Sequence, residues 1–348
     1  MNSRKIRVTL LLFVALVASL PMSACAASRP PAEPRRRTEL QLGTVCTITF
    51  MDGGDEAAFD AVFARLAEIH ARMSAQEPGS ELSRIADAAG KSPVAVSPDT
   101  FAVIEQALRY AELSGGAFDP TIGPLVRLWD IGGDGERIPS APEIEAALAL
   151  ADRKSVILDK AKGTVFLAKA GMRLDLGAIA KGYAADEAAR IMLERGVRAG
   201  IVDLGGNIMT VGRKPDGTPW RVGVQNPFSD RGEYLGIVAS EAKTVVTSGV
   251  YERFFEEGGR RYHHILSTVG GYPVENGLWA VSIIADRSID ADGLSTSVFA
   301  LGLEKGRALV ESLAGIEAVF IDADKKIYLS SGASKLFTLT DGAFTLAD

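Results

Sequence analysis

The sequence predicts an α+β fold, in which mixed or antiparallel sheets pack against helices within a single large domain. Between residues 199 and 285, β-branched segments follow one another with glycine turns and no helix-length segment between them. Before and after this region, apolar residues recur at intervals of three and four residues over helix-length segments. Consecutive strands favour antiparallel pairing, because a doubly wound parallel sheet needs a helix after each strand.

The individual elements follow from the same signals. Residues 40–50 alternate as an opening strand, and apolar residues from Phe59 to Met73 have helical spacing. Further helices are expected over residues 98–113, 179–195, 289–301 and 304–314. Further strands are expected over residues 164–168, 199–204, 220–225, 235–239, 244–246, 262–266, 279–285, 318–321 and 326–329.

Residues 1–24 have the composition of a secretory signal peptide. Arg4, Lys5 and Arg7 precede an apolar run from Val8 to Leu20 that contains no acidic residue. The run is too short to span a bilayer comfortably, which takes about 20 residues. We therefore expect export, which would place the mature protein on the periplasmic side of a bacterial membrane.

Cys25 is the predicted site of lipid attachment. Met22-Ser23-Ala24-Cys25 resembles a bacterial lipobox, and a lipid on the cysteine would anchor the protein to the membrane. Ala24-Cys25-Ala26 also fits the site of the ordinary signal peptidase, which would give a soluble periplasmic protein. Residues 25–37 contain three prolines and Arg35-Arg36-Arg37 and are expected to form an extended tether, with the domain over residues 38–348.

Charge and cysteine content narrow the classes of function. The formal net charge is −6, and the signal peptide removes basic but no acidic side chains, so nucleic-acid binding is not expected. The sequence has two cysteines, Cys25 and Cys46. A mature chain cleaved beside Cys25 has no internal disulfide, and Cys46 is expected to be a buried strand residue.

A loop rich in glycine and proline over residues 115–124 is the first candidate binding segment. Phe118 offers an aromatic face, and Asp119 offers a carboxylate that can accept hydrogen bonds from a ligand. An ordinary turn with a buried aromatic residue explains the same pattern, so both interpretations stay open at this point.

The segment from Asp175 to Tyr183 predicts a phosphate-binding helix N-terminus. A strand end runs through Gly177 into a helix, and a helix N-terminus presents free backbone N–H groups to an anion. Lys181 adds a positive charge that suits a diphosphate. The glycine spacing matches neither a Walker A loop nor G-x-G-x-x-G, and a packing role for the glycine is the alternative.

Two further segments carry candidate metal and proton-transfer groups. Asp292 and Thr296 share one face of a predicted helix, where a carboxylate and a hydroxyl suit Mg²⁺; an N-cap aspartate is the alternative. His263 and His264 lie on an alternating strand, so one ring should face a site and the other should face outward, unless both are surface residues. His70 is the only other histidine, so zinc lacks ligands.

Eight segments, in this order, resemble the FAD:protein FMN transferase family, which is also called the ApbE or flavin-trafficking family. They are Leu42-Gly43-Thr44, Ser80-Glu81-Leu82-Ser83-Arg84-Ile85, Gly116-Ala117-Phe118-Asp119-Pro120, Asp175-Leu176-Gly177-Ala178-Ile179-Ala180-Lys181-Gly182-Tyr183, Asp203-Leu204-Gly205-Gly206-Asn207, Thr247-Ser248-Gly249, His264-Ile265-Leu266 and Ala291-Asp292-Gly293-Leu294-Ser295-Thr296. The resemblance covers nearly the whole chain after the tether and implies a single ApbE-like domain.

The resemblance implies roles for particular residues. Mg²⁺ would be held by the Ala178 carbonyl, Asp292 and Thr296. His264 lies beside Ile265, and histidine side chains titrate near neutral pH, so our own hypothesis is that His264 is the catalytic base or orients the acceptor hydroxyl. FAD would be bound by Leu42, Gln76, Ala117, Phe118, Asp119, Asp175, Lys181 and Ile265.

Two places depart from the family pattern. Gln76 stands where the family often has a tyrosine that packs on the flavin. Ser267-Thr268-Val269-Gly270-Gly271 stands where many members have Asp-Pro-Arg-Thr-Gly. The first departure would change stacking on the flavin. The second would change binding of the metal or of the acceptor protein.

The implied reaction is Mg²⁺-dependent transfer of FMN. The pyrophosphate of FAD is cleaved, FMN is attached through a phosphoester to a threonine or serine of an exported flavoprotein subunit of a redox complex, and AMP is released. An FAD pyrophosphatase, in which water is the acceptor, is the alternative enzyme. A periplasmic FAD-binding lipoprotein without catalytic activity is the alternative from a different class.

Overall fold

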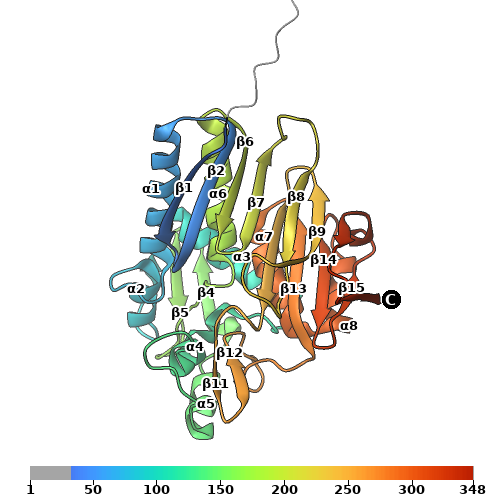
Figure 1. Cartoon of the computed structure of the whole chain (residues 1–348). Helices are drawn as coiled ribbons and strands as arrows, with labels where there is room; N and C mark the ends of the chain where they lie inside the picture. The colour runs from blue at the N-terminus through green and yellow to red at the C-terminus, as the bar shows by residue number, and fades with distance from the viewer. Residues whose placement is uncertain (1–32, 348) are drawn as a thin grey trace, which may run out of the picture. The chain divides into compact units, whose positions relative to one another are not determined.

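The structure is a computed structural model and describes residues 33–347. Its first element is a β-hairpin. β1 (Arg35–Gln41) pairs antiparallel with β2 (Thr44–Gly53) (Figure 1). Leu42 and Gly43, with φ of 54° and 68°, form the two-residue turn between them. The prediction of a single strand over residues 40–50 is wrong, because this left-handed turn folds the segment back on itself.

Arg37 belongs to β1 rather than to a solvated tether. Its guanidinium forms ion pairs with Glu56 (2.7 Å) and Asp60 (2.6 Å) and lies 5.1 Å from the ring centroid of Phe59. The domain therefore begins at least three residues before residue 38, inside the segment that was predicted as a tether. The predicted signal peptide and Cys25 lie outside the described residues.

A nine-stranded sheet forms the centre of the fold. Its strand order is β1-β2-β6-β7-β10-β13-β14-β15-β17, and β15 and β17 are its only parallel neighbours within residues 33–347. This antiparallel pairing confirms the predicted α+β class. The further strands are β6 (Val197–Leu204), β7 (Asn207–Gly212), β10 (Thr244–Gly249), β13 (Leu278–Ala285), β14 (Glu317–Asp322), β15 (Lys326–Leu329) and β17 (Thr345–Ala347).

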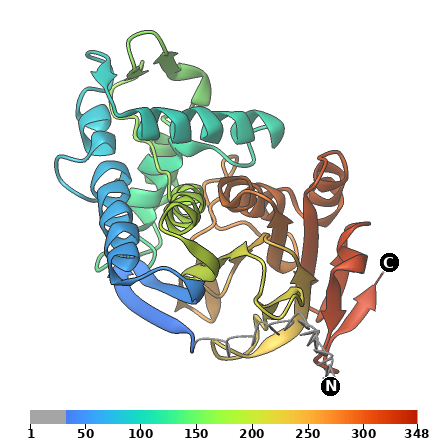
Figure 2. The same ribbon diagram turned by 90° about the horizontal axis from the view of Figure 1, so that it is seen from above.

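Helices cover one face of this sheet (Figure 2). α1 (Glu56–Met73), α6 (Ala180–Glu194), α7 (Ser288–Leu301) and α8 (Leu303–Glu311) lie on this face, and α3 (Pro98–Leu113) packs against α7. The bounds of all five helices are close to the predicted ones. Apolar residues that recur at helical spacing in α1, such as Phe59, Phe63 and Leu66, are buried in the core between helices and sheet. No helix among residues 33–347 has the length and hydropathy needed to cross a membrane.

A smaller sheet covers part of the opposite face. β8 (Trp220–Gln225), β9 (Tyr234–Ser240) and β16 (Phe337–Leu339) are its strands. Their apolar side chains pack against the second face of β13, where Ala280 and Ile284 are fully buried. β13 is therefore buried on both faces, which explains its almost continuous apolar sequence.

Short elements complete the chain. They are α2 (Glu81–Asp87), α4 (Gly123–Trp129), α5 (Ala141–Leu148), β3 (Val94–Ala95), β4 (Val156–Asp159), β5 (Thr164–Leu167), β11 (Phe254–Glu257), β12 (Arg260–His263) and the 3₁₀ turns η1 (Pro120–Ile122), η2 (Arg153–Ser155) and η3 (Ala333–Lys335). Most of these elements have no signal in the sequence, because segments of two to eight residues contain too few turns of a helix or too few alternations of a strand to be periodic.

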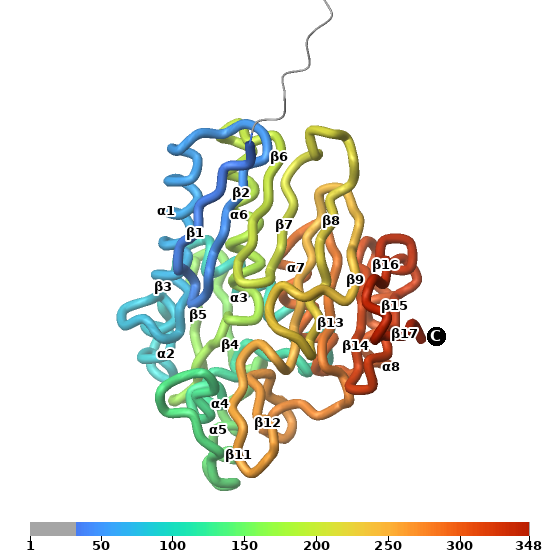
Figure 3. Tube along the Cα trace, viewed as in Figure 1, coloured from blue at the N-terminus to red at the C-terminus, as the bar shows by residue number. Residues whose placement is uncertain are grey.

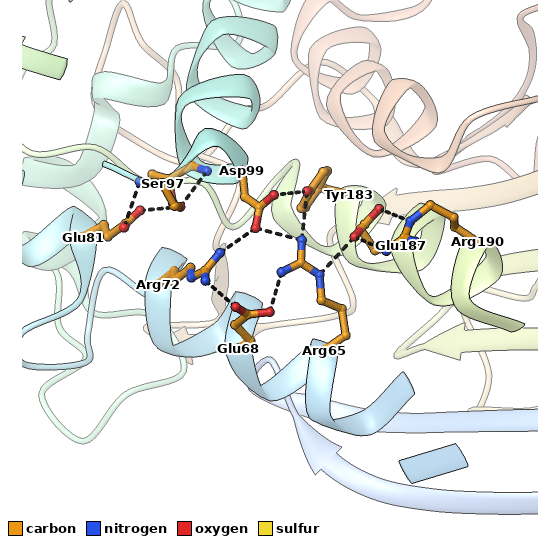
Figure 4. A network of polar contacts seen from close by, with 10 residues as sticks. Arg65, Glu68, Arg72, Glu81, Ser97, Asp99, Tyr183, Glu187 and Arg190 are labelled. Atoms are coloured by element: carbon orange, nitrogen blue, oxygen red, sulfur yellow. Dashed lines mark hydrogen bonds and ion pairs between the residues drawn. The ribbon is translucent and has the colours of Figure 1, made fainter. Parts of the chain in front are cut away.

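A charged network ties α1, α3 and α6 together (Figure 4). Asp99 accepts hydrogen bonds from Arg65 (2.7 Å), Arg72 (2.7 Å) and the Tyr183 hydroxyl (2.8 Å). Arg65 also pairs with Glu187 at 3.0 Å. The network fixes the first turns of α6 relative to α1, and both of these helix ends contribute walls to the cavity described next.

Candidate active site

A cavity of about 510 Å³ is lined by residues from the end of α1, the start of α6, α7 and the segments around β10 and β12. Figure 3 shows the course of the chain through these elements. These segments are far apart in the sequence. The cavity lining includes every residue that the sequence analysis placed in the site: Leu42, Gln76, Ala117, Phe118, Asp119, Asp175, Ala178, Lys181, His264, Ile265, Asp292 and Thr296. The fold thus brings all these residues to one place, while their individual roles stay predictions.

Asp175 and Gly177 shape the turn that leads into α6. Asp175 Oδ1 accepts a hydrogen bond from the Gly177 amide (2.8 Å), and Lys181 Nζ donates to the Gly177 carbonyl (2.9 Å). Among the residues that the structure describes, the amides of Ala178 and Lys181 donate to no other group. These two N–H groups and the Lys181 ammonium group are the donors that this helix start offers to an anion.

Asp292 connects α7 to the start of α6. It lies inside α7 rather than at its N-cap, is 3% exposed, and its Oδ2 accepts a hydrogen bond from the Gly182 amide (2.8 Å). A Cβ atom on Gly182 would lie 2.3 Å from the Ser288 carbonyl oxygen and 2.7 Å from Asp292 Cβ. The glycine therefore lets the two helices approach closely, and this contact holds the carboxylate against the cavity.

Three oxygen donors in this corner fit a hard cation. Among the described residues Asp292 Oδ1 accepts no hydrogen bond and lies 3.8 Å from Lys181 Nζ, and the Thr296 hydroxyl shares a hydrogen bond with Ser248 (3.2 Å). Within residues 33–347, no hydrogen bond ends on the Ala178 carbonyl, since the Gly182 amide that would normally reach it donates to Asp292. Mg²⁺ binds one or two carboxylates together with substrate phosphates and waters, so this donor set suits it.

The same described region contains no cluster of three or more His, Cys, Asp and Glu side chains that could hold a metal. A site with one carboxylate, one hydroxyl and one carbonyl oxygen is compatible with that finding.

The loop that carries Phe118 and Asp119 leads into η1. Asp119 Oδ1 accepts hydrogen bonds from the amide (2.8 Å) and the hydroxyl (2.6 Å) of Thr121, and Oδ2 lies 3.9 Å from Arg153. Asp119 therefore shapes its own turn while one carboxylate oxygen is left for a ligand. Phe118 is only 5% exposed and belongs to the core as well as to the cavity wall, so the two interpretations of this loop are compatible.

The two adjacent histidines have different surroundings. β12 ends at His263, whose Nε2 lies 3.0 Å from the Val274 carbonyl oxygen. His263 is 5% exposed, so the expectation that one ring faces outward is wrong. Of the two, only His264 lines the cavity.

The main chain fixes the orientation of the His264 ring. Its Nδ1 lies 3.2 Å from the carbonyl oxygen of Arg253, and a carbonyl oxygen can only accept, so Nδ1 carries the proton of the neutral ring. Burial, with a smaller contribution from Arg253, lowers the pKa of His264 to about 3. The ring is therefore neutral at pH 7, and its Nε2 is a free hydrogen-bond acceptor.

A model of the ApbE family matches residues 42–320 of the chain. The chain belongs to the ApbE family. This result confirms the resemblance that the eight ordered segments indicated, and the matched region contains every predicted site residue of the described domain.

Relatives and solved structures agree with this assignment to the ApbE family. The chain is 39% identical over 327 residues to an FAD:protein FMN transferase of Treponema pallidum, covering 89% of this chain and 90% of the relative. It is 39% identical over 294 residues to an FAD:protein FMN transferase of Klebsiella pneumoniae, covering 84% and 91%. The crystal structure of the ApbE protein from Thermotoga maritima superposes with a TM-score of 0.81 at 33% identity, covering 87% of this chain and 99% of that protein.

The first departure from the ApbE-family pattern is at the mouth of the cavity. Gln76 is exposed, and its side chain forms no hydrogen bond within the described residues. The position lines the cavity without an aromatic face. This part of the cavity wall is therefore exposed to solvent.

The second departure, residues 267–271, forms a well-anchored turn. Ser267 Oγ accepts hydrogen bonds from the amides of Val269 and Gly270, both at 3.2 Å. Thr268 Oγ1 donates to the Gly116 carbonyl (2.7 Å). The serine thus bonds the turn amides as an aspartate at this position could, and the threonine holds the turn against the loop that carries Asp119.

Several residues that line the cavity were not predicted from the sequence. Arg231 lies in the loop between β8 and β9, where no periodic pattern or motif marks it, and Trp129 ends a helix that was not predicted. Glu252 and Arg253 follow the Thr247-Ser248-Gly249 segment by a few residues, and that proximity was the one signal that could have identified them.

Proposed function

We propose that this protein is an Mg²⁺-dependent FAD:protein FMN transferase. The observation that carries the proposal is the convergence, in one cavity, of a helix start with free N–H groups, three oxygen donors for a cation and a neutral histidine. Two relatives at 39% identity are named FAD:protein FMN transferase. A cavity of several hundred Å³ with a few convergent polar groups is typical of a cofactor-sized ligand.

The chain's residues would divide FAD between two parts of the cavity. Leu42, Phe118 and Ile265 offer apolar surface for the ring systems, while the start of α6 offers Lys181 and backbone amides for the diphosphate. When bound by Asp292, Thr296 and the Ala178 carbonyl, Mg²⁺ would neutralise charge on the diphosphate oxygens.

The transfer step then needs one nucleophile and one leaving group. The hydroxyl oxygen of an acceptor threonine or serine forms a bond to the phosphorus of the FMN half, and the bond from that phosphorus to the bridging oxygen breaks. AMP leaves with the bridging oxygen and its electron pair, and the proton of the acceptor hydroxyl passes to the leaving phosphate or to water. Lys181 and the amides of Ala178 and Lys181 would stabilise the charge that develops on the phosphate oxygens.

Nε2 of His264 would accept a hydrogen bond from the hydroxyl of the acceptor residue. Because its pKa is lowered to about 3, the ring is a weak base in the free enzyme, and a hydrogen bond that orients the hydroxyl is its better supported role. Nδ1 is held by the Arg253 carbonyl, so the ring needs no reorientation before it accepts.

A variant of His264 tests this role. We expect His264→Ala to reduce the rate of FMN transfer by about a hundredfold, because the acceptor hydroxyl loses the hydrogen bond that orients it, with FAD affinity within a few-fold of the original. Loss of FAD binding would instead mean a structural role, and full retention of transfer would contradict the assignment.

The acceptor and the compartment are part of the proposal. We infer that the acceptor is an exported flavoprotein subunit, because residues 1–24 have the composition of a signal peptide. Lipidation of Cys25 would hold the domain at the periplasmic side of the membrane, and cleavage after Ala26 would give a soluble periplasmic protein. Mass spectrometry of the mature N-terminus distinguishes these two outcomes.

One incubation separates transfer from its rivals. The mature protein is mixed with FAD, Mg²⁺ and an exported flavoprotein subunit, and protein mass and nucleotides are followed. Covalent FMN on the subunit together with AMP supports transfer. Free FMN and AMP without a mass change would mean an FAD pyrophosphatase, and unchanged FAD would mean a carrier. Water can compete with the protein acceptor because the cavity is open to solvent beside the exposed Gln76.

A further inference from the structure

Three cations surround one carboxylate in the cavity wall. Lys181, Arg231, Arg253 and Glu252 all line the cavity. Burial raises the pKa of Glu252, and all three cations lie close enough to oppose that rise. The charges of Arg253 and Lys181 also lower the pKa of His264. The carboxylates of Asp203 and Asp292 also lie near this group, so the wall has charges of both signs, and the two arginines differ from Lys181 in having no side-chain partner of their own among the described residues.

The two arginines of this group have free guanidinium groups. Within residues 33–347, neither Arg231 nor Arg253 forms a hydrogen bond or an ion pair through its guanidinium, whereas Lys181 lies 3.8 Å from Asp292. Glu252 does not approach either arginine to within ion-pair distance. An unpaired guanidinium in a cavity is ready to bind an anionic group of a ligand.

Each of the two arginine side chains passes close to the backbone of a glycine. Arg231 Nη2 would lie 3.6 Å from a Cβ atom on Gly206, so the guanidinium extends over the turn between β6 and β7. Arg253 Cδ would lie 3.5 Å from a Cβ atom on Gly132. The arginines come from two different loops, and each lies against a glycine backbone that leaves room for it.

We propose that Arg231 and Arg253 form an anion subsite that binds a phosphate of the dinucleotide substrate. The proposal rests on the proposed function, because a dinucleotide brings two phosphates to the cavity. The start of α6 and the oxygen donors beside it suit one phosphate, and two forked guanidinium groups suit a second. A carboxylate of the acceptor protein has the same chemistry, and the experiment distinguishes it.

The experiment compares variants in which one cavity arginine is replaced by neutral glutamine with a matched control variant outside the cavity. Arg231→Gln and Arg253→Gln each remove one cation from the cavity. Arg221→Gln removes an exposed arginine on β8 that also lacks an ion pair within the described residues but lies outside the cavity lining. The Kd of each mature protein for FAD, FMN, AMP and riboflavin is measured by calorimetry with Mg²⁺ present.

We expect each cavity variant to weaken FAD binding by about tenfold, as the loss of one charge-assisted hydrogen bond predicts. Riboflavin, which has no phosphate, should bind within twofold of the original, and Arg221→Gln should leave all four values unchanged. A parallel loss for either FMN or AMP then assigns the subsite to that half of FAD.

Three outcomes would overturn the proposal. FAD affinity unchanged in both variants would mean that no phosphate contacts these arginines. Equal losses for FAD and riboflavin would mean that the arginines only support the fold. Unchanged FAD affinity with a KM for the acceptor protein raised about tenfold would assign the anion to the acceptor. A protein that binds FAD through the arginines but transfers no FMN would refute the proposed function and leave the subsite intact.

Discussion

The two sides of the cavity differ in how their functional groups are held. On the helix side, Asp292 is 3% exposed, receives the Gly182 amide and lies in a contact that only a glycine permits. On the loop side, the side chains of Gln76, Arg231 and Arg253 are exposed and form no hydrogen bond with other described residues. One side is fixed by packing before a ligand arrives, and the other side has groups whose partners come with the ligand.

This difference separates two requirements of group transfer. The phosphorus and the cation must be held to within a fraction of an ångström, which packed helices can do. The groups that recognise the rest of the substrate and the acceptor can lie on loops, where they tolerate change. Substitutions on the helix side should therefore affect rate or stability strongly, and substitutions on the loop side should alter affinity moderately.

The largest effect is expected for Asp292→Asn. The amide keeps the size of the carboxylate and can still accept from Gly182, but it removes the negative charge that a cation needs. We expect the rate of AMP release at saturating FAD to fall by at least about a hundredfold, since a catalytic cation contributes several kcal/mol. Raising Mg²⁺ should restore part of the lost rate, because the other oxygen donors are still present.

Asp286→Asn is the matched control for this variant. Asp286 pairs with Lys243 on the protein surface and does not line the cavity, so its rate should not change. An Asp292→Asn protein with at least half of the original rate at every Mg²⁺ concentration would show that the carboxylate holds no essential cation.

A smaller effect, on stability, is expected for Asp99→Asn. Burial alone would raise the pKa of Asp99, but hydrogen bonds from Tyr183 and Arg65 outweigh it and hold the pKa below its usual value. We expect the variant to lose about 2 kcal/mol of unfolding free energy at pH 7, because three donors lose a charged acceptor. Urea unfolding of both proteins measures the difference.

The pH dependence of this difference has a definite sign. A depressed carboxyl pKa stabilises the fold above the unfolded-state pKa of about 3.9, and this contribution is lost as the pH falls through the lower folded-state value. The gap between the two proteins should therefore shrink below about pH 4. A gap that is constant from pH 7 to pH 3 would mean that charge at Asp99 is not its source. Asp52→Asn, which breaks an exposed pair with Arg198, should cost less at every pH.

The same difference explains which parts of the site the sequence could predict. Helix-side groups such as Lys181 and Asp292 lie in helix-length segments in which glycine and charged residues occur close together. Arg231 lies in a loop whose position depends on how two sheets pack, and no local pattern encodes that packing. The hairpin turn at Leu42 was hidden within an apparently continuous strand, because the alternation of side chains continues on both sides of it.

The smallest effect, and the sharpest test of the loop side, is expected for Gln76→Tyr. The position lines the cavity and its side chain has no hydrogen bond to lose. A tyrosine there would offer an aromatic face to the flavin, and aromatic pairs contribute about 0.5–1.5 kcal/mol, so FAD affinity should rise by roughly two- to tenfold. Gln76→Leu adds apolar surface without an aromatic ring and should give a smaller gain. If both variants bind FAD as the original does, Gln76 does not face the flavin, and the open mouth of the cavity serves the acceptor instead.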